Sequence, residues 1–283
     1  MKLESKTIIV TGGSLGIGLA VSKKIVSEGG TVIICARDKD DLVSAVKELK
    51  EISNRDQYYY QADISKLNEV QSFSNWIRRE FGEIHGLVNC AGVYGPIGKS
   101  TKVNMNHFLD TININLMGTI YMCTTFSELF SSENKKKIVN FSGGGAASSF
   151  PNYSAYAASK VAVVRFTENL SIELLDENFE INCIAPGFVA TRIHQKTLNA
   201  GPELAGENFY NSTTKMLKNN SISSDFAADL TSFLLSDESN GITGKFISAN
   251  WDPWKEDSFQ NLLKTDKDFA TIRRIDNKTF YKK

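Results

Sequence analysis

Tyr156 and Lys160 are the two residues whose types and spacing point most directly to chemistry. On a helix, positions four apart share a face, so the lysine ammonium can lie near the phenol. A free tyrosine has a pKa of about 10 and is a poor base at neutral pH. A nearby cation favours the phenolate and lowers that pKa, which suits a group that must give or take a proton. The pair therefore predicts acid–base chemistry, with a packed tyrosine beside a surface lysine as the alternative.

A second candidate site is the glycine-rich segment from Thr11 to Gly18. Phosphate binding needs a turn without Cβ atoms and free backbone N–H groups at a helix N-terminus, where the helix dipole favours negative charge. Gly12, Gly16 and Gly18 supply both, because the segment follows a predicted strand and opens a helix. A lone glycine triplet is weak evidence, but this position between strand and helix predicts a dinucleotide site.

The end of the second predicted strand carries Arg37 and Asp38. In dinucleotide-binding folds this strand end meets the adenosine ribose, where an acid bonds the 2′-hydroxyl and an arginine accommodates a 2′-phosphate. Arg37 therefore points to NADP(H), with an exposed arginine at a strand end as the alternative. A small rotation of the backbone would place the Asp38 carboxylate near the ribose instead, so NAD(H) stays possible.

The elements that must position these residues are short strands that alternate with longer helical segments. The strands lack strict polar alternation and read as near-continuous apolar runs, which is typical of strands buried on both faces. They are predicted at Thr7–Thr11, Thr31–Ala36, Tyr58–Ala62, Gly86–Asn89, Lys137–Ser142, Glu180–Ala185 and Lys245–Ala249. Helical spacing joins Ile17, Ala20, Val21 and Ile25 in one intervening segment, and Val70, Phe73, Trp76 and Ile77 in another. The alternation predicts an α/β chain of the Rossmann type, a doubly wound parallel sheet with helices on both faces, in a single domain.

Composition excludes several classes of partner. The 32 basic and 32 acidic residues give no positive field for nucleic acid or an anionic membrane. No apolar run approaches the ~18 residues of a membrane span, and because a strand is predicted within a few residues of the N-terminus we expect no signal peptide. The cysteines are far apart in apolar stretches, and the three histidines lack metal-like spacing, so we expect reduced thiols and no metal. A cytoplasmic protein is expected.

Five motifs in the right order resemble the short-chain dehydrogenase/reductase family over about residues 5–250. The glycine segment matches that family's T-G-x-x-x-G-x-G pattern, and Tyr156 to Lys160 matches its Y-x-x-x-K pattern. Three further segments resemble its N-x-A-G strand end, its catalytic-asparagine helix and its nicotinamide-side loop: Asn89–Gly92, Asn115–Gly118, and Pro186-Gly187 with Thr191. The resemblance implies an NAD(P)(H)-dependent oxidoreductase that interconverts a carbonyl and a secondary alcohol.

The resemblance also implies roles for individual residues. Tyr156 exchanges the proton, Lys160 also holds the nicotinamide ribose, and Asn115 supports a proton relay. Asp63, after the third strand, resembles the residue that contacts adenine. The cofactor-binding residues expected on this basis are Gly12, Ser14, Gly16, Ile17, Gly18, Arg37, Asp63, Ile64, Asn89, Ala91, Gly92, Tyr156, Lys160, Pro186, Gly187 and Thr191.

One position departs from the family's pattern. The family places a serine about thirteen residues before the tyrosine, where its hydroxyl steadies the substrate oxygen, and here that position is Gly143. Ser142 is one residue early, and in a regular strand it points to the other face. Three glycines follow, however, and they permit a bulge that re-aims a neighbouring side chain. Ser142 is therefore the fourth catalytic candidate, with a backbone N–H of the glycine run as the alternative donor.

Residues 188–224 fall where the family keeps its substrate lid, within a cofactor-binding domain over residues 1–250. Their mixed polar content argues against a sterol or a long acyl chain, and Arg192, His194 and Lys196 are candidate partners for an anionic group, although such charges are usually solvated. We expect a polar small molecule, such as a polyol, a sugar or a nucleotide-linked sugar. The alternative is a cofactor-binding, catalytically silent redox sensor or scaffold, which the absent serine leaves open.

The helix expected from about Ala155 to Leu175 bears on assembly. It carries apolar residues beyond one face, namely Val161, Val164, Phe166, Leu170 and Leu174. In the resembled family this helix pairs with a copy of itself, which implies a homodimer or homotetramer; the alternative is that these residues only cover the sheet. Residues 251–283 are expected to form a C-terminal extension of the same domain, with Trp251 and Trp254 placed to cap a neighbouring subunit.

Overall fold

The computed structural model describes residues 1–218 and 222–275. Within these residues a parallel sheet has the strand order β3-β2-β1-β4-β5-β6-β7. The strands are β1 (Thr7–Thr11), β2 (Thr31–Ala36), β3 (Tyr58–Gln61), β4 (Gly86–Asn89), β5 (Lys136–Phe141), β6 (Phe179–Ala185) and β7 (Phe246–Ser248). The order reverses between β1 and β4, which is the switch point where open α/β sheets bind their ligands.

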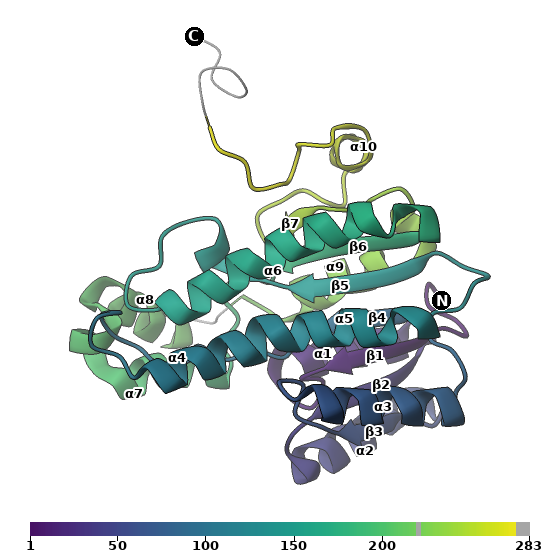
Figure 1. Cartoon of the computed structure of the whole chain (residues 1–283), viewed down its shortest axis with the longest axis horizontal. Coiled ribbons are helices and arrows are strands. Elements are labelled where there is room, and N and C mark those ends of the chain that lie inside the picture. The colour runs from purple at the N-terminus through teal and green to yellow at the C-terminus, as the bar shows by residue number, and fades with distance from the viewer. Residues whose placement is uncertain (219–221, 276–283) are drawn as a thin grey trace.

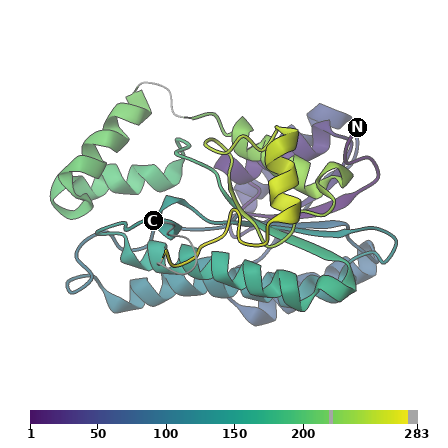
Figure 2. The ribbon, with the colours of Figure 1, turned by 90° about the horizontal axis from the view of Figure 1, so that it is seen from above.

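Helices cover both faces of this sheet (Figures 1 and 2). They are α1 (Gly16–Ser27), α2 (Lys39–Ser53), α3 (Leu67–Glu80), α4 (Met105–Ile112), α5 (Gly118–Phe126), α6 (Ser154–Glu173), α7 (Arg192–Ala205), α8 (Glu207–Lys218), α9 (Asp225–Leu235) and α10 (Asp257–Thr265). The doubly wound Rossmann-type prediction is confirmed, and the predicted strand ends differ from the observed ones by at most one residue.

Side-chain alternation along β1 explains why the strands read as continuous apolar runs. Successive residues of a strand point to opposite faces. Ile8 and Val10 accordingly belong to the core shared with α1, α2 and α9. Ile9 belongs to the core shared with α3, α5 and α6. Because both faces are covered, every residue in the middle of this strand must be apolar.

The predicted lid forms two helices that extend beyond the carboxyl ends of the strands (Figure 1). Helices α7 and α8 pack against each other, and Gly201, with φ 75°, breaks the helical path inside α7 just before Pro202. Residues 219–221 of the expected lid lie outside the described residues.

The C-terminal extension packs on the same domain as far as residue 275. Trp254 is buried against Phe233 of α9 and donates from Nε1 to the Ala249 carbonyl oxygen, 3.2 Å away. The expectation that Trp254 caps a neighbouring subunit is therefore wrong, because its own chain buries it. Trp251, the other tryptophan in that expectation, is 79% exposed. Among the described residues no helix is both long and apolar enough to cross a membrane. The end of the expected extension, residues 276–283, lies outside them.

Candidate functional site

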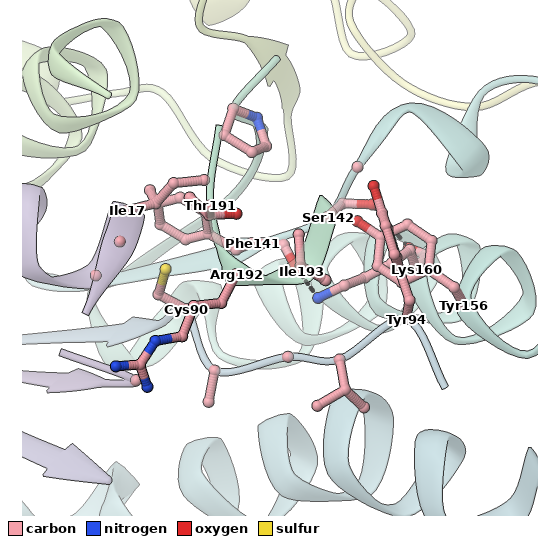
Figure 3. Close-up of a pocket in the computed structure, with 18 of the residues that line it drawn as sticks. Ile17, Cys90, Tyr94, Phe141, Ser142, Tyr156, Lys160, Thr191, Arg192 and Ile193 are labelled. Carbon is pink, nitrogen blue, oxygen red and sulfur yellow. Dashed lines mark hydrogen bonds between the residues drawn. The ribbon is translucent and has the colours of Figure 1, made fainter. Parts of the chain in front are cut away.

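A cavity of about 1060 Å³ opens at the carboxyl ends of the strands, beside the switch point. Its walls come from the glycine segment, the ends of β2 and β4, residues 141–150, the start of α6 and residues 185–196. Figure 3 shows Tyr94, Ser142, Tyr156 and Lys160 grouped on one side of the cavity, with Cys90 and Arg192 on the other. The volume is at the upper end of ligand sites, which suits a large ligand.

The glycine segment forms a cradle that stays open because its glycines have no Cβ atoms. Gly12 has a φ of 65°, and a Cβ atom there would lie 2.9 Å from the Ala91 Cα. A Cβ atom at Gly18 would lie 2.1 Å from the Gly12 carbonyl oxygen, so α1 approaches the turn closely only because this residue is glycine. The first N–H groups of α1 face this turn, and together these features fit the pyrophosphate of a dinucleotide.

The end of β2 presents an arginine, while the neighbouring carboxylate is already engaged. The Asp38 side chain caps α2 by accepting hydrogen bonds from the N–H groups of Asp40 and Asp41, both at 3.0 Å. Arg37 is exposed and lines the cavity. Asp63, at the adjacent strand end, accepts from the Ser65 N–H and hydroxyl through one carboxylate oxygen. This arrangement favours the arginine over Asp38 as the group that meets a ribose substituent.

Tyr156 and Lys160 lie one turn apart on α6, and both line the cavity. The Lys160 ammonium donates to the Phe141 carbonyl oxygen at 2.8 Å and lies 5.9 Å from the centre of the Tyr156 ring. Burial raises the pKa of Tyr156 and lowers the pKa of Lys160. The expectation of a lowered pKa for the phenol is therefore wrong for this structure, because the loss of hydration on burial is the largest influence on the pKa of Tyr156.

The Ser142 hydroxyl does not turn toward Tyr156. Gly143 is extended, with φ −173° and ψ 173°, so the chain continues past Ser142 without the bulge that the sequence permits. The Ser142 hydroxyl donates to the Lys160 carbonyl oxygen at 2.9 Å. A Cβ atom at Gly143 would lie 2.3 Å from the Tyr156 hydroxyl oxygen. The phenol oxygen thus occupies the space that a serine side chain at position 143 would need.

Asn115 and Asn89 both lie behind the cavity wall rather than on it. Asn115 sits in a π-helical turn, Asn113–Met117, and such turns are frequent at functional sites. Its amide accepts from the Val93 N–H at 2.8 Å and donates to the Val93 carbonyl oxygen at 2.9 Å, so it fixes the loop after β4. The Asn89 amide instead donates to Asn140 Oδ1 at 2.9 Å inside the core.

Most of the residues predicted to bind the cofactor do line this cavity. Asn89 is the exception, because its side chain points into the core and not into the cavity. The ones that line it are Gly12, Ser14, Gly16, Ile17, Gly18, Arg37, Asp63, Ile64, Ala91, Gly92, Tyr156, Lys160, Pro186, Gly187 and Thr191.

An aromatic wall that no sequence motif predicted lines the cavity that holds Tyr156. The rings come from four separate segments: Tyr94, Phe150, Phe188 and Phe209. The Tyr94 ring stands perpendicular to the Tyr156 ring, with centres 4.8 Å apart. These residues carry no local motif, so only their gathering in the fold identifies them.

The three lid residues that were expected to meet an anionic group differ in their surroundings. His194 is buried between Phe188 and Tyr94, and burial lowers its pKa to about 4, so it is neutral at neutral pH. Arg192 is paired with Asp41 of α2 at 3.2 Å. Lys196 is exposed at the edge of the cavity. His194 therefore offers no positive charge to a substrate.

Comparison with known proteins agrees with this geometry. The profile of the family described as short chain dehydrogenase matches residues 6–201. The chain is 30% identical to a 3-oxoacyl-(acyl-carrier-protein) reductase of Chlamydia trachomatis over 250 residues, which cover 88% of this chain and 97% of that one. It is 29% identical to a 7alpha-hydroxysteroid dehydrogenase of Bacteroides fragilis over 203 residues, covering 70% and 77% of the two chains.

Solved structures show the same fold. L-sorbose reductase from Gluconobacter frateurii, in complex with NADPH and L-sorbose, superposes with a TM-score of 0.78 at 22% identity, covering 88% of this chain and 96% of that one. Levodione reductase superposes with a TM-score of 0.79 at 23% identity, covering 89% and 98%.

Proposed function

The chain belongs to the short-chain dehydrogenase family, whose NAD(P)-dependent members interconvert carbonyls and alcohols, and we propose that it does so with Tyr156 as the acid/base. The observation that carries the proposal is that Tyr156, Lys160 and the glycine cradle open into one cavity. A bound nicotinamide dinucleotide supplies or accepts the hydride. In this proposal the glycine segment holds its pyrophosphate, and Lys160, whose ammonium lies behind Gly92, holds the nicotinamide-side ribose.

In the reductive direction Tyr156 gives its proton to the oxygen of the substrate carbonyl. The raised pKa keeps this phenol protonated at neutral pH, which suits the proton donor of a reduction. Lys160 returns a proton to Tyr156, and the cavity connects this site to solvent. Asn115 acts as a positioning residue, because its hydrogen bonds to Val93 fix the loop that faces Tyr156.

We further propose that the substrate is a polar small molecule with one apolar face. Tyr94 and Phe150 pack against the Tyr156 ring, and Phe209 lines the same cavity. Such rings pack against the C–H face of a ring while its polar groups point elsewhere. Ser148 and Ser149 line the same cavity and offer hydroxyls. A sugar or a nucleotide-linked sugar meets both requirements, and its reduction should exceed that of a straight-chain ketone.

The test is oxidation of NADPH, followed by its absorbance, against a panel of sugars with a ring ketone, open-chain sugars, cyclic ketones and straight-chain ketones. We expect turnover with at least one cyclic carbonyl compound. Tight cofactor binding in calorimetry without turnover of any panel member would instead favour a catalytically silent sensor or scaffold.

Arg37 should set the choice of cofactor. A charge-assisted hydrogen bond contributes roughly 1.5–3 kcal/mol, so NADP(H) should bind on the order of tenfold or more tightly than NAD(H). Replacing Arg37 with alanine should remove this preference, measured as the ratio of the two dissociation constants by calorimetry. Lys39→Ala is the matched control, because Lys39 is exposed two residues further along, at the start of α2, but does not line the cavity. Equal affinities in the unmodified protein would contradict the assignment.

We propose that the protein forms a homodimer or homotetramer through the outer face of α6. Val164 and Leu170 cover the sheet and cannot serve a partner, so that part of the sequence-based interpretation is wrong. Ile172 is 75% exposed, and Val161 is exposed on the same helix. Sedimentation at micromolar concentration should show a species larger than the protomer, and Ile172→Glu should shift it toward the protomer. A monomeric unmodified chain would refute the proposal.

We also propose a cytoplasmic location. The cysteines of the described residues are all free, which suits a reducing compartment. Recovery of the native protein mainly in a membrane or secreted fraction would count against it.

A further inference from the structure

The reacting oxygen of a carbonyl has two lone pairs and gains negative charge as hydride reaches its carbon. Preorganised hydrogen-bond donors aimed at that oxygen lower the barrier. Tyr156 supplies one donor. Ser142 does not supply another, because its hydroxyl donates to the Lys160 carbonyl oxygen, and Gly143 has no side chain. Apart from the backbone N–H groups of the glycine run, the second donor must therefore come from another segment of the cavity lining.

Tyr94 lies on such a segment, the loop after β4, on the same side of the cavity as Tyr156. Asn115 clamps the preceding residue, Val93, through both its N–H and its carbonyl oxygen. The Tyr94 ring packs edge to face against Tyr153 at 5.2 Å and against His194 at 5.6 Å. The backbone clamp and the ring contacts together hold the side chain in one position, with 5% of its surface exposed.

The hydroxyl of Tyr94 is available to a ligand. It makes no hydrogen bond to any residue of the described ranges 1–218 and 222–275, and neither does the hydroxyl of Tyr156. Tyr153, in the same aromatic cluster, is different, because its hydroxyl is bonded to Thr197 Oγ1 at 2.9 Å. Tyr94 and Tyr156 are also the two tyrosines that line the cavity within those ranges, side by side in Figure 3.

The protonation state of Tyr94 suits a donor that keeps its proton. Burial raises the pKa of Tyr94 above that of a free tyrosine, and a negative charge on Tyr156 raises it further. The phenol therefore stays neutral whenever Tyr156 exchanges a proton. It can therefore donate a hydrogen bond to an oxygen in the cavity without giving up its own proton.

We propose that Tyr94 is a further catalytic residue, whose hydroxyl donates the second hydrogen bond to the substrate oxygen that Tyr156 protonates. The inference rests on the proposed carbonyl–alcohol function. In the reduction the carbonyl carbon gains hydride from the reduced cofactor, which is thereby oxidised, and the oxygen gains the Tyr156 proton. Tyr94 keeps its own proton throughout and stabilises the charge that builds on the oxygen.

The experiment uses the full chain, NADPH and phenanthrenequinone as a flat, reactive carbonyl probe. Tyr94→Phe retains the ring and its packing but removes the donor, so we expect kcat and kcat/KM to fall together by about 10²-fold. The NADPH dissociation constant and the shape of the pH profile should stay as in the unmodified protein. Tyr153→Phe is the matched control, because it removes a hydroxyl from the same cluster, and Ser142→Ala removes the neighbouring one; both should retain near-normal turnover.

Four outcomes would overturn the inference. Near-normal kcat in Tyr94→Phe, or equal losses in Tyr94→Phe and Tyr153→Phe, would mean that the Tyr94 hydroxyl has no special role, while the proposed function stands. A rise in KM with unchanged kcat would assign the hydroxyl to ground-state binding. An unmodified protein that binds NADPH but reduces neither the probe nor any other carbonyl would remove the proposed function, and the inference with it.

Discussion

Replacing Tyr156 with phenylalanine should lower turnover at least ~100-fold, in line with the usual contribution of a general acid or base. The substitution removes the phenol oxygen but keeps the ring that packs against Tyr94 and Phe150. Cofactor affinity should stay nearly unchanged, because the glycine cradle and Lys160 are untouched. Steady-state kinetics and calorimetry with NADP(H) check the two halves of this prediction. Near-normal turnover would mean that the reacting group lies elsewhere.

The pH dependence gives an independent check on the same residue. Alcohol oxidation needs the phenolate as the base, and burial raises the pKa of Tyr156. The oxidation rate should therefore climb with pH, by about tenfold per unit, until that pKa is reached. Carbonyl reduction needs the protonated phenol, so its rate should be level across the neutral range. In Tyr156→Phe the residual oxidation should lose the rise with pH.

Replacing Lys137 with methionine should lower the free energy of unfolding by about 3–5 kcal/mol, because it leaves a buried carboxylate without its partner. Lys137 of β5 is 1% exposed and forms an ion pair with Glu180 of β6, at the end of the sheet away from the cavity. The ammonium also donates to Asn240 Oδ1 at 2.8 Å and to Ser239 Oγ at 3.1 Å. Urea unfolding at fixed protomer concentration measures the change.

The double variant Lys137→Met/Glu180→Gln separates two causes of the lost stability: the missing ion-pair attraction and the unpaired buried charge of Glu180. Glutamine keeps an acceptor for the Gly241 N–H, which now donates to Glu180 at 2.8 Å, and it carries no charge. Most of the lost stability should therefore return in the double variant. A single variant as stable as the unmodified protein would show that the pair has little influence on folding.

Features that depend on residues close together in the chain were predicted from the sequence. The strand ends fell within one residue of those observed, because buried apolar runs and flanking glycines are local signals. The glycine turn follows from the same kind of signal, since backbone freedom and the start of α1 are properties of one short segment. The spacing of Tyr156 and Lys160 also needs only the period of a helix to place both on one face. The order of these motifs along the chain was enough to indicate the family.

Features that depend on contacts between distant segments were decided by the tertiary structure alone. Asn89 points into the core because Asn140 lies beside it on β5, and Ser142 is held by the backbone of α6. Trp254 is buried because α9 supplies Phe233 as its neighbour. The aromatic wall and the position of Tyr94 come from segments more than a hundred residues apart, which no local pattern relates. The raised pKa of Tyr156 has the same origin, because the hydration a phenol loses depends on every element that packs around it.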